Sequence, residues 1–368
     1  MTVLAAVLSE PNGKFEVQTV QLGELGEDEV LVRVAGVGIC HTDLAVRDRV
    51  IPVPLPAVLG HEAAGVVERL GSKVSSLDVG DKVVLGFMSC GHCPACSDAV
   101  PGYCNQFAPL NFMGSRPDGS TAWTMEGAPL GSHYFGQSSF ATHAVANFRN
   151  VVKVTTDLPL EFLGPLGCGF MTGAGAVLNA LDCKRGSSIA VFGAGPVGMA
   201  AIMAAKTRGL ASIIAVDPLA ARRQAALDCG ATHAIDPSTG ADVSASIRML
   251  EELGVDAALD TTGLPEVIAA GIAALAKRGT LALVAAPKAA GATVPVAFGA
   301  LAASGARIIG VMEGDADPQS FVPALLELQR QGLFPFERLI QTYPFAEIER
   351  AIAEQAEGRC VKAVLTME

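Results

Sequence analysis

The chain has 368 residues, of which half are hydrophobic and 17% are charged. Because one hydrophobic core seldom serves more than about 250–300 residues, this length predicts two domains. The 37 acidic residues outnumber the 26 basic residues and give a formal net charge of −11. Proteins that bind nucleic acids neutralise phosphates with Lys and Arg, so this balance argues against a nucleic-acid partner.

The mean hydropathy of +0.41 is high and raises the alternative of a membrane protein. Residues 162–181 and 187–205 carry no charge and are long enough to span a bilayer. Glycine and proline interrupt both stretches, which is unfavourable for a continuous helix in lipid. The first ten residues lack the basic leader and cleavage site of a secretory signal. We therefore expect a cytoplasmic protein with no membrane span.

The first part of the chain, to about residue 155, is rich in short apolar segments separated by Gly and Pro. These segments predict β-strands at residues 29–37, 65–70 and 81–86. No long amphipathic helix is predicted in this part of the chain.

From about residue 185, short apolar strands alternate with Ala-rich helical segments, a pattern typical of a parallel sheet that is covered on both faces. The predicted strands are residues 188–192, 213–217, 233–235, 255–260, 280–284 and 307–311. They predict a doubly wound nucleotide-binding fold. The remaining predicted elements are helices at 321–331 and 345–356 and strands at 339–343 and 361–366.

A glycine-rich turn follows the strand at 188–192 and precedes a predicted helix. Its glycines are Gly193, Gly195 and Gly198, and Asp217 ends the next strand, 19 residues after Gly198. In dinucleotide-binding folds such a turn approaches the pyrophosphate, and the acidic residue accepts hydrogen bonds from the adenosine ribose. A carboxylate there repels a ribose phosphate, so NAD is favoured over NADP. The alternative is a turn that serves only strand-to-helix packing.

Nine cysteines, an odd number, indicate metal binding or thiolate chemistry rather than a disulfide framework. Four of them lie in one turn-rich segment at a spacing that lets their sulfurs converge on one ion: Cys90, Cys93, Cys96 and Cys104. Closed coordination by four thiolates is typical of a structural zinc. An iron–sulfur cluster and a zinc ribbon are the alternatives. For Cys183, Cys229 and Cys360 we expect packing roles.

A second metal constellation combines Cys40, His61 and Cys168. Three protein ligands with a fourth position open to water or substrate are what a catalytic zinc requires. Each residue taken alone has an ordinary explanation, because buried cysteines and histidines are usually packing or hydrogen-bonding residues.

Several segments together identify a family. The segment Gly60-His61-Glu62-x-x-Gly65 is followed by Gly71 and Val74, and residues 38–43, 136–141 and 164–175 carry further motifs. With the four-cysteine loop, they make the chain resemble the zinc-containing medium-chain alcohol dehydrogenases, most of all the bacterial benzyl or aryl alcohol dehydrogenases. The resemblance implies an α/β architecture: a GroES-like, β-rich catalytic domain at 1–170 and 308–368, and a Rossmann NAD-binding domain at 171–307.

The resemblance also implies two zinc ions per chain. Cys40, His61 and Cys168 would hold the catalytic zinc, Glu62 would be an occasional alternative ligand, and the four-cysteine loop would hold the structural zinc. Asp43 would fix the orientation of His61 through its second ring nitrogen.

Other residues match the family's cofactor and substrate positions. Thr42 would bind the alcohol and pass on its proton, and Thr172 would pack against the nicotinamide. His41 and Lys362 would face the cofactor pyrophosphate, and Phe87 would line the substrate pocket. At position 41 many members carry arginine. We therefore expect NADH binding to tighten as the pH falls, because histidine is only partly charged near neutrality.

The proton relay is another departure, because Ala45 stands where liver-type members carry a histidine. We expect the proton to leave through water. The implied reaction is NAD-dependent oxidation of a primary aromatic or allylic alcohol to the aldehyde, by a homotetramer or homodimer. The alternatives are a glutathione-dependent formaldehyde dehydrogenase, a general aliphatic alcohol dehydrogenase and a non-catalytic relative.

Overall fold

A computed structural model describes residues 1–286, 288–289 and 291–367. The chain divides into two compact units. The first unit comprises Met1–Gly169, Asp317–Leu326 and Leu339–Glu368, and the second comprises Phe170–Ala316 and Glu327–Arg338. The predicted boundary at 307/308 falls inside strand β16 (Arg307–Gly310), which pairs with a strand of the second unit. Because of this pairing, the chain stays in the second unit as far as Ala316, beyond the boundary expected at 307/308.

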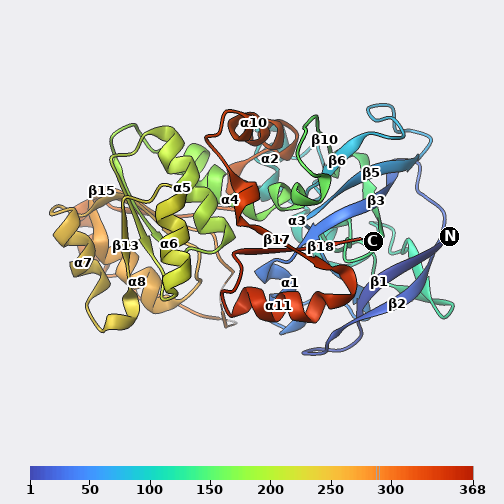
Figure 1. The fold of residues 1–368 in the computed structure, drawn as a ribbon, viewed down its shortest axis with the longest axis horizontal. Coiled ribbons are helices and arrows are strands. Elements are labelled where there is room, and N and C mark those ends of the chain that lie inside the picture. Colours follow the sequence, from blue (N-terminus) through green and yellow to red (C-terminus); the bar gives the residue numbers. More distant parts are fainter. Residues whose placement is uncertain (287, 290, 368) are drawn as a thin grey trace. The chain divides into compact units, whose positions relative to one another are not determined.

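The first unit is built on two sheets that are largely antiparallel (Figure 1). The smaller sheet has the order β4-β1-β2-β7-β8, formed by Ala57–Val58, Thr2–Leu8, Phe15–Leu22, Trp123–Met125 and Ala128–Leu130. β1 and β2 are not among the predicted strands. Their apolar residues Leu4 and Val17 are exposed, which obscures the alternation expected of a half-buried strand.

The larger sheet positions the residues of the candidate site. Its order is β10-β6-β5-β3-β18-β17, with β9 also paired to β3. These strands are Val151–Lys153, Lys82–Leu85, Ala63–Leu70, Glu29–Gly38, Lys362–Thr366, Ile340–Pro344 and, for β9, His143–Asn147. The predicted strands in these regions are confirmed. β18 pairs antiparallel with the end of β3, with Val364 opposite Gly38.

The first unit also contains short helices. They are α1 (His41–Arg47), α2 (Pro94–Ser97), α3 (Phe107–Phe112) and α11 (Ile348–Ala356). α10 (Pro318–Arg330) runs from the first unit into the segments of the second. The helices predicted at 321–331 and 345–356 correspond to α10 and to α11 with the turn before it.

The second unit contains a parallel sheet with the order β13-β12-β11-β14-β15-β16 (Figure 1). Its first five strands in that order are His233–Ile235, Ser212–Val216, Ser188–Phe192, Val255–Asp260 and Leu275–Leu283. β11 and β12 are buried at every position, as expected where helices cover both faces. The predicted doubly wound fold is confirmed.

The helices of this unit are α5 (Pro196–Arg208), α6 (Ala220–Cys229), α7 (Val243–Leu250), α8 (Pro265–Ala274) and α9 (Phe298–Ser304), and α4 (Gly169–Gly175) leads into it. Gly195 caps α5, and Pro196 is the first residue of the helix. Proline is well tolerated there, since the first helical N–H has no partner within the helix.

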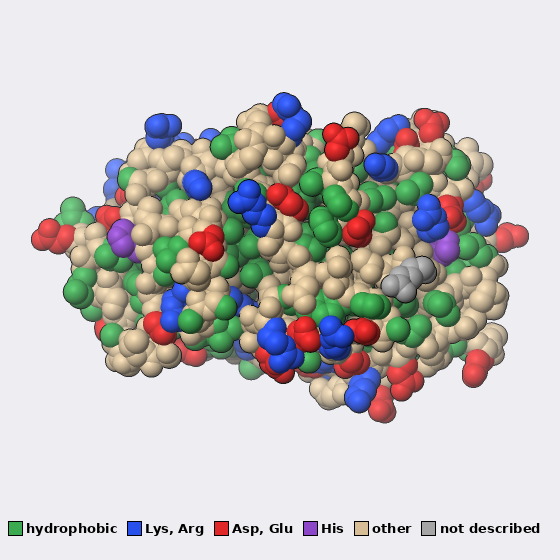
Figure 2. Space-filling model, viewed as in Figure 1, with side chains coloured by type: hydrophobic (Ala, Val, Ile, Leu, Met, Phe, Trp, Pro, Cys, Tyr) green, Lys and Arg blue, Asp and Glu red, His purple; other side chains and the backbone are tan. Residues whose placement is uncertain are grey.

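In the described part of the chain, no helix has both the length and the apolar character needed to cross a bilayer. The uncharged stretch 162–181 consists of several short helical turns around α4. The stretch 187–205 is β11, the glycine turn and most of α5. On the face shown in Figure 2, Lys and Arg side chains are interspersed with Asp and Glu.

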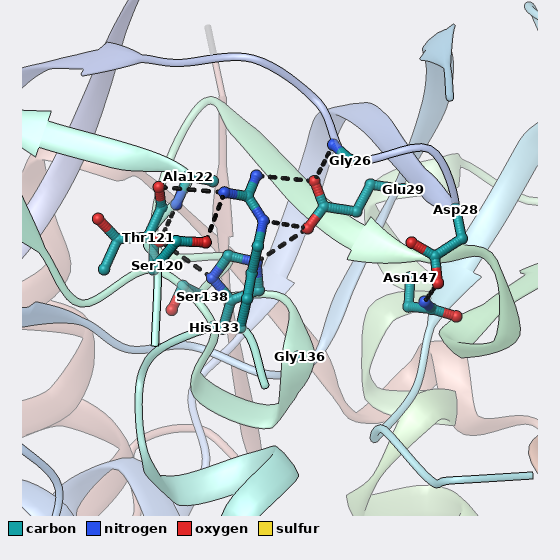
Figure 3. A network of polar contacts seen from close by, with 12 residues as sticks. Gly26, Asp28, Glu29, Ser120, Thr121, Ala122, His133, Gly136, Ser138 and Asn147 are labelled. Carbon is teal, nitrogen blue, oxygen red and sulfur yellow. Dashed lines mark hydrogen bonds and ion pairs between the residues drawn. The ribbon is translucent and has the colours of Figure 1, made fainter. Parts of the chain in front are cut away.

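A buried carboxylate ties the start of β3 to two loops (Figure 3). The Nε and Nη2 atoms of Arg116 donate to the two carboxylate oxygens of Glu29 at 2.7 and 2.8 Å. His133 Nε2 lies 3.3 Å from Glu29 Oε1, and the Gly26 N–H donates to Oε2 at 2.6 Å. Burial alone would raise the pKa of Glu29, but these partners outweigh it and lower the pKa to about 2.

The same network fixes the loop that leads to the candidate site. Ser132 Oγ accepts a hydrogen bond from the Ala122 N–H at 2.9 Å and lies 3.1 Å from His133 Nδ1. His133 directly precedes Tyr134 and Phe135, whose rings are part of the site described below. The Glu29 carboxylate therefore supports the loop that carries these two rings.

We expect Glu29→Gln to lower the free energy of unfolding at pH 7 by about 2 kcal/mol, because Arg116 loses its charged partner. The folded-state pKa of Glu29 is depressed, so its contribution is complete above the unfolded pKa near 4.5 and disappears as the pH falls toward 2. The difference between the two proteins should shrink over that interval. Fluorescence of Trp123, the single tryptophan, would report unfolding of the first unit.

Glu27→Gln is the matched control. Glu27 pairs with Lys73 at 2.5 Å, but both side chains are about two-thirds exposed, and such surface pairs contribute little to stability. Equal stabilities of the parent and Glu29→Gln at pH 7 would contradict the role given to the Glu29 network.

Candidate active site

Asp43 organises a buried cluster at the end of β3. It lies in the first turn of α1 and has no solvent exposure. Its Oδ1 atom is 2.9 Å from His61 Nδ1 and accepts the Gly60 N–H at 3.2 Å, while Oδ2 accepts the Cys40 N–H at 3.0 Å. One carboxylate therefore fixes both the imidazole of His61 and the backbone of Cys40. This is the placement expected for Asp43.

The structure brings together Cys40, His61, Glu62 and Cys168, which come from three distant parts of the chain. Their ligand atoms all lie within 4.8 Å of one another. His61 Nε2 is buried and has no hydrogen-bond partner among the described residues. Two thiols, an imidazole and a carboxylate are suitable ligands for zinc, and an orphaned ring nitrogen facing them fits a metal ion.

The electrostatics of the cluster also fit a cation. A hydrogen bond with Cys168 and the nearby His61 hold the pKa of the Cys40 thiol well below its usual range, although burial opposes this. Burial lowers the pKa of His61, but the negative charges of Asp43 and Cys40 outweigh it, and the pKa lies well above its usual value. The thiolate form of Cys40, which is the form that binds a metal ion, is therefore favoured in this buried region.

The four cysteines of the predicted structural site also converge. The sulfurs of Cys90, Cys93, Cys96 and Cys104 lie within 4.8 Å of one another. The Cys93–Cys96 and Cys90–Cys96 sulfur distances are 3.6 and 3.9 Å, too long for disulfide bonds. Backbone N–H groups of Asn105 and Cys96 lower the pKa of Cys93 to about 6. The thiolate, the form that binds zinc, is thus favoured at Cys93, whereas burial raises the pKa of Cys104 to about 12.

The glycine turn of the second unit has the geometry of a dinucleotide site. Gly193 has a φ of +92°, and a Cβ on Gly198 would lie 1.9 Å from the carbonyl oxygen of Gly193. A Cβ on Gly195 would meet no described atom within 4 Å, so this glycine faces open space at the start of α5. A phosphate can approach the helix N-terminus closely at such a position.

Asp217 was predicted to end its strand; it directly follows β12, which ends at Val216, and it is buried. Its Oδ2 atom accepts the Ala194 N–H and its Oδ1 atom accepts the Leu219 N–H, both at 2.8 Å. The carboxylate is therefore held beside the glycine turn with its orientation fixed. Each oxygen keeps further capacity to accept hydrogen bonds from a ribose.

Family profiles match both parts of the chain. The Alcohol dehydrogenase GroES-like domain matches residues 26–156, and the Zinc-binding dehydrogenase domain matches residues 196–330. The geraniol dehydrogenase of Castellaniella defragrans is 48% identical over 362 residues, which cover 98% of this chain and 96% of that protein. The chain belongs to the zinc-containing medium-chain alcohol dehydrogenase family. The resemblance seen in the sequence is confirmed.

Solved structures agree with this membership of the alcohol dehydrogenase family. The benzyl alcohol dehydrogenase of Acinetobacter calcoaceticus is 43% identical with a TM-score of 0.96, and the similarity covers 100% of both chains. An alcohol dehydrogenase zinc-binding domain protein of Burkholderia ambifaria is 49% identical with a TM-score of 0.97, covering 100% of this chain and 99% of that one. The predicted combination of a GroES-like and a Rossmann domain is thereby confirmed.

In this alcohol dehydrogenase, aromatic side chains surround the ring of His61. Phe135 stacks on His61 with ring centroids 4.3 Å apart and an interplanar angle of 21°, and Tyr134 meets it edge-on at 5.5 Å. Phe112 and Phe107 contact Phe135 edge-on at 5.3 and 6.2 Å. Phe87, the predicted pocket residue, reaches this cluster through Phe107 at 5.6 Å.

Four of these rings, Phe107, Phe112, Tyr134 and Phe135, are not among the predicted site residues. Phe135 has a φ of +52°, a conformation that is uncommon for a bulky residue. The segment 136–141 was a sequence signal close to it, and Gln137 of that segment donates to the His61 carbonyl at 3.0 Å. The stacking itself depends on loops whose conformations have no sequence signature.

Lys362 lies beside Glu62. Its side chain is 1% exposed, and its ammonium pairs with the buried carboxylate of Glu62 and donates to the Ile39 carbonyl at 2.8 Å. Glu62 Oε1 in turn accepts the Gly169 N–H at 3.3 Å. Lys362 therefore contacts the candidate metal cluster, and its expected role at the cofactor pyrophosphate stays a prediction. The pairing of β18 with β3 places it there.

The surroundings of Thr42, His41 and Thr172 are defined by contacts within the chain. Thr42 Oγ1 is 3.6 Å from the sulfur of Cys40. His41 is exposed at the first position of α1. Thr172, in the second unit, donates from Oγ1 to Glu313 Oε2 at 3.4 Å, and Glu313 is a further residue that the sequence did not indicate.

We expect Lys362→Met to lower the free energy of unfolding by about 3 kcal/mol, because it leaves the Glu62 carboxylate buried without its counter-ion. The double variant Glu62→Gln/Lys362→Met should recover most of that loss, since no uncompensated charge stays buried. Denaturant unfolding followed by Trp123 fluorescence measures both variants.

Lys153→Met is the control, because Lys153 pairs with Asp81 at 2.7 Å with half of its side chain exposed; its effect should be below about 0.5 kcal/mol. If Lys362→Met were as stable as the parent and bound ADP-ribose more weakly, the lysine would face the pyrophosphate after all.

Proposed function

We propose that the chain oxidises primary aromatic or allylic alcohols to aldehydes with NAD as the hydride acceptor. The observation that carries this proposal is the aromatic wall beside His61, in which Phe135 stacks on the imidazole and Phe112 packs against Phe135. Aromatic and apolar walls with few polar groups favour flat, apolar ligands. Relatives described as geraniol and benzyl alcohol dehydrogenases support this substrate class.

In the proposed enzyme, Cys40, His61 and Cys168 would hold a catalytic zinc, with Glu62 as an occasional ligand. The four-cysteine cluster would hold a structural zinc. A zinc ion bound at the first site supplies Lewis-acid chemistry, which lowers the pKa of an alcohol and favours its alkoxide. The first unit would thus be the catalytic domain and the second the NAD-binding domain.

The chain's own residues then have defined tasks. Asp43 accepts the Nδ1 proton of His61, which leaves the Nε2 lone pair directed at the ligand cluster. Thr42, beside the Cys40 sulfur, would accept the alcohol proton at Oγ1 while donating its own proton onward. Ala45 offers no further acceptor, so the proton would continue to water. The aromatic rings keep water from the imidazole face.

For the cofactor, the glycines at 193, 195 and 198 would admit the pyrophosphate to the start of α5, and Asp217 would bind the adenosine ribose. The carboxylate of Asp217 would repel a 2′-phosphate, which favours NAD over NADP. Thr172 would pack against the nicotinamide, and His41 would face the pyrophosphate. Assembly into a homotetramer or homodimer and a cytoplasmic location stay predictions from the resemblance.

A substrate panel tests the proposal. With NAD, we expect kcat/KM for benzyl alcohol and geraniol to exceed that for ethanol by about a hundredfold or more, since differential burial of apolar groups gives factors of this size. Phe135→Leu should reduce the preference for benzyl alcohol over ethanol by about tenfold, because leucine keeps the apolar bulk but removes the ring.

Phe148→Ala, at a ring outside the His61 cluster, should leave the preference unchanged. Two results would overturn the proposed substrate class. One is oxidation of formaldehyde only in the presence of glutathione, and the other is equal activity on ethanol and benzyl alcohol. Faster reduction of NADP than of NAD would contradict the role given to Asp217.

Metal analysis tests the two proposed zinc sites. We expect about two zinc ions per purified chain, because each cluster supplies a complete ligand set. Asp43→Asn should weaken zinc binding at one site by about 10- to 100-fold, the usual effect of removing a residue that orients a metal histidine. Chelator competition with a zinc-sensitive dye measures this affinity.

Asp81→Asn removes a carboxylate outside both clusters and serves as the control, with no expected change in zinc binding. A parent protein that purifies with one zinc ion or none, and that binds no more when zinc is added, would contradict the assignment of two sites.

A further inference from the structure

An unusual turn follows the last strand of the parallel sheet. β16 ends at Gly310, and Glu313, Gly314 and Asp315 have φ values of +53°, +71° and +49°. Three successive residues in the left-handed region are costly when two of them carry side chains. Such a conformation persists only where the surrounding structure imposes it, and it is often found at functional positions.

Close packing against α4 and the turn that follows it holds this conformation. A Cβ on Gly314 would lie 2.6 Å from the Met171 carbonyl oxygen, and a Cβ on Gly175 would lie 2.2 Å from the Gly314 carbonyl oxygen. Asn179 Nδ2 also donates to the carbonyls of Gly314 and Asp315, both at 3.2 Å. The backbone at 313–315 is therefore fixed by contacts within the second unit.

The turn holds the Glu313 carboxylate in a buried position. Glu313 is 7% exposed, and its Oε2 atom accepts the hydroxyl proton of Thr172 at 3.4 Å. Burying a carboxylate is unfavourable unless compensating groups or a ligand offset the loss of water. None of the steps proposed above uses this carboxylate.

Glu313 lies in the same unit as the glycine turn that follows β11. α4, which carries Thr172, packs directly on the start of α5: a Cβ on Gly173 would lie 1.9 Å from the Val197 carbonyl oxygen. Glu313 follows β16, whereas Asp217 follows β12, and β11 with its glycine turn lies between these strands in the sheet. A dinucleotide extends along the carboxyl ends of the strands, with one nucleoside on each side of the pyrophosphate. With the adenosine ribose at Asp217, the nicotinamide half lies on the side of Glu313.

We propose that Glu313 is a cofactor-binding residue whose negative charge favours the oxidised nicotinamide over the reduced one. The oxidised ring is a cation and the reduced ring is neutral, so a nearby carboxylate in a partly buried environment attracts only the first. This inference rests on the proposed use of NAD. It implies that the attraction ends once the hydride has been transferred, which would favour release of NADH.

Calorimetric titration of the purified protein with NAD⁺, NADH and ADP-ribose tests the inference without requiring turnover. Glu313→Gln keeps the size of the side chain and a hydrogen-bonding group for Thr172 but removes the charge. We expect it to weaken NAD⁺ binding by about tenfold relative to NADH. Binding of ADP-ribose, which lacks the nicotinamide, should be unchanged.

Two further variants separate charge from structure. Glu313→Asp keeps the charge and should retain the parent's ratio of NAD⁺ to NADH affinity within about threefold. Asp315→Asn removes the same formal charge from the same turn and should also leave the ratio within about threefold. If Asp315→Asn changed the ratio as much as Glu313→Gln, the assignment to Glu313 would be wrong.

The remaining outcomes distinguish this inference from the proposed function. If Glu313→Gln changed NAD⁺ and NADH affinity equally, or neither, the inference would fail while NAD use stood. If it also weakened ADP-ribose, Glu313 would have a structural role only. A parent protein that bound neither NAD⁺ nor NADH would overturn the proposed use of NAD and this inference with it.

Discussion

The carboxylate of Asp43 holds two otherwise independent parts of the candidate metal cluster in place. Through Oδ2 it fixes the backbone of Cys40, and through Oδ1 it fixes the ring of His61 and the backbone of Gly60. Because Asp43 lies in the first turn of α1, the end of β3 and the start of that helix determine where it points. Replacing Asp43 would remove the hydrogen bond that fixes the orientation of the His61 ring.

The cost of burying so many polar groups together is offset by specific partners. Glu62 has the ammonium of Lys362 and the Gly169 N–H, and Cys40 has Cys168 and His61. The sulfurs of Cys40 and Cys168 still lie close to the orphaned Nε2 of His61. A bound cation would satisfy these ligand atoms, and the stacked ring of Phe135 covers one face of the imidazole.

Local motifs predicted much of this arrangement. The residues around Cys40, His61 and the glycine turn lie within short segments whose spacing already encodes a turn or a helix start. The contacts that the sequence did not predict link segments that are distant along the chain. Lys362 reaches Glu62 only because β18 pairs with β3 in a particular register, which no local pattern specifies. The same holds for Glu29 with Arg116, for Phe135 on His61 and for Glu313 with Thr172.

X-ray absorption at the zinc edge of the purified protein tests the central claim most directly. With one ion held by four thiolates and the other by Cys40, Cys168 and His61, the account predicts an average of about three sulfur neighbours per zinc at about 2.3 Å, together with a histidine contribution. An average of four sulfurs per zinc without a histidine signal, or coordination by oxygen and nitrogen alone, would contradict the assignment of the Asp43-centred cluster as a zinc site.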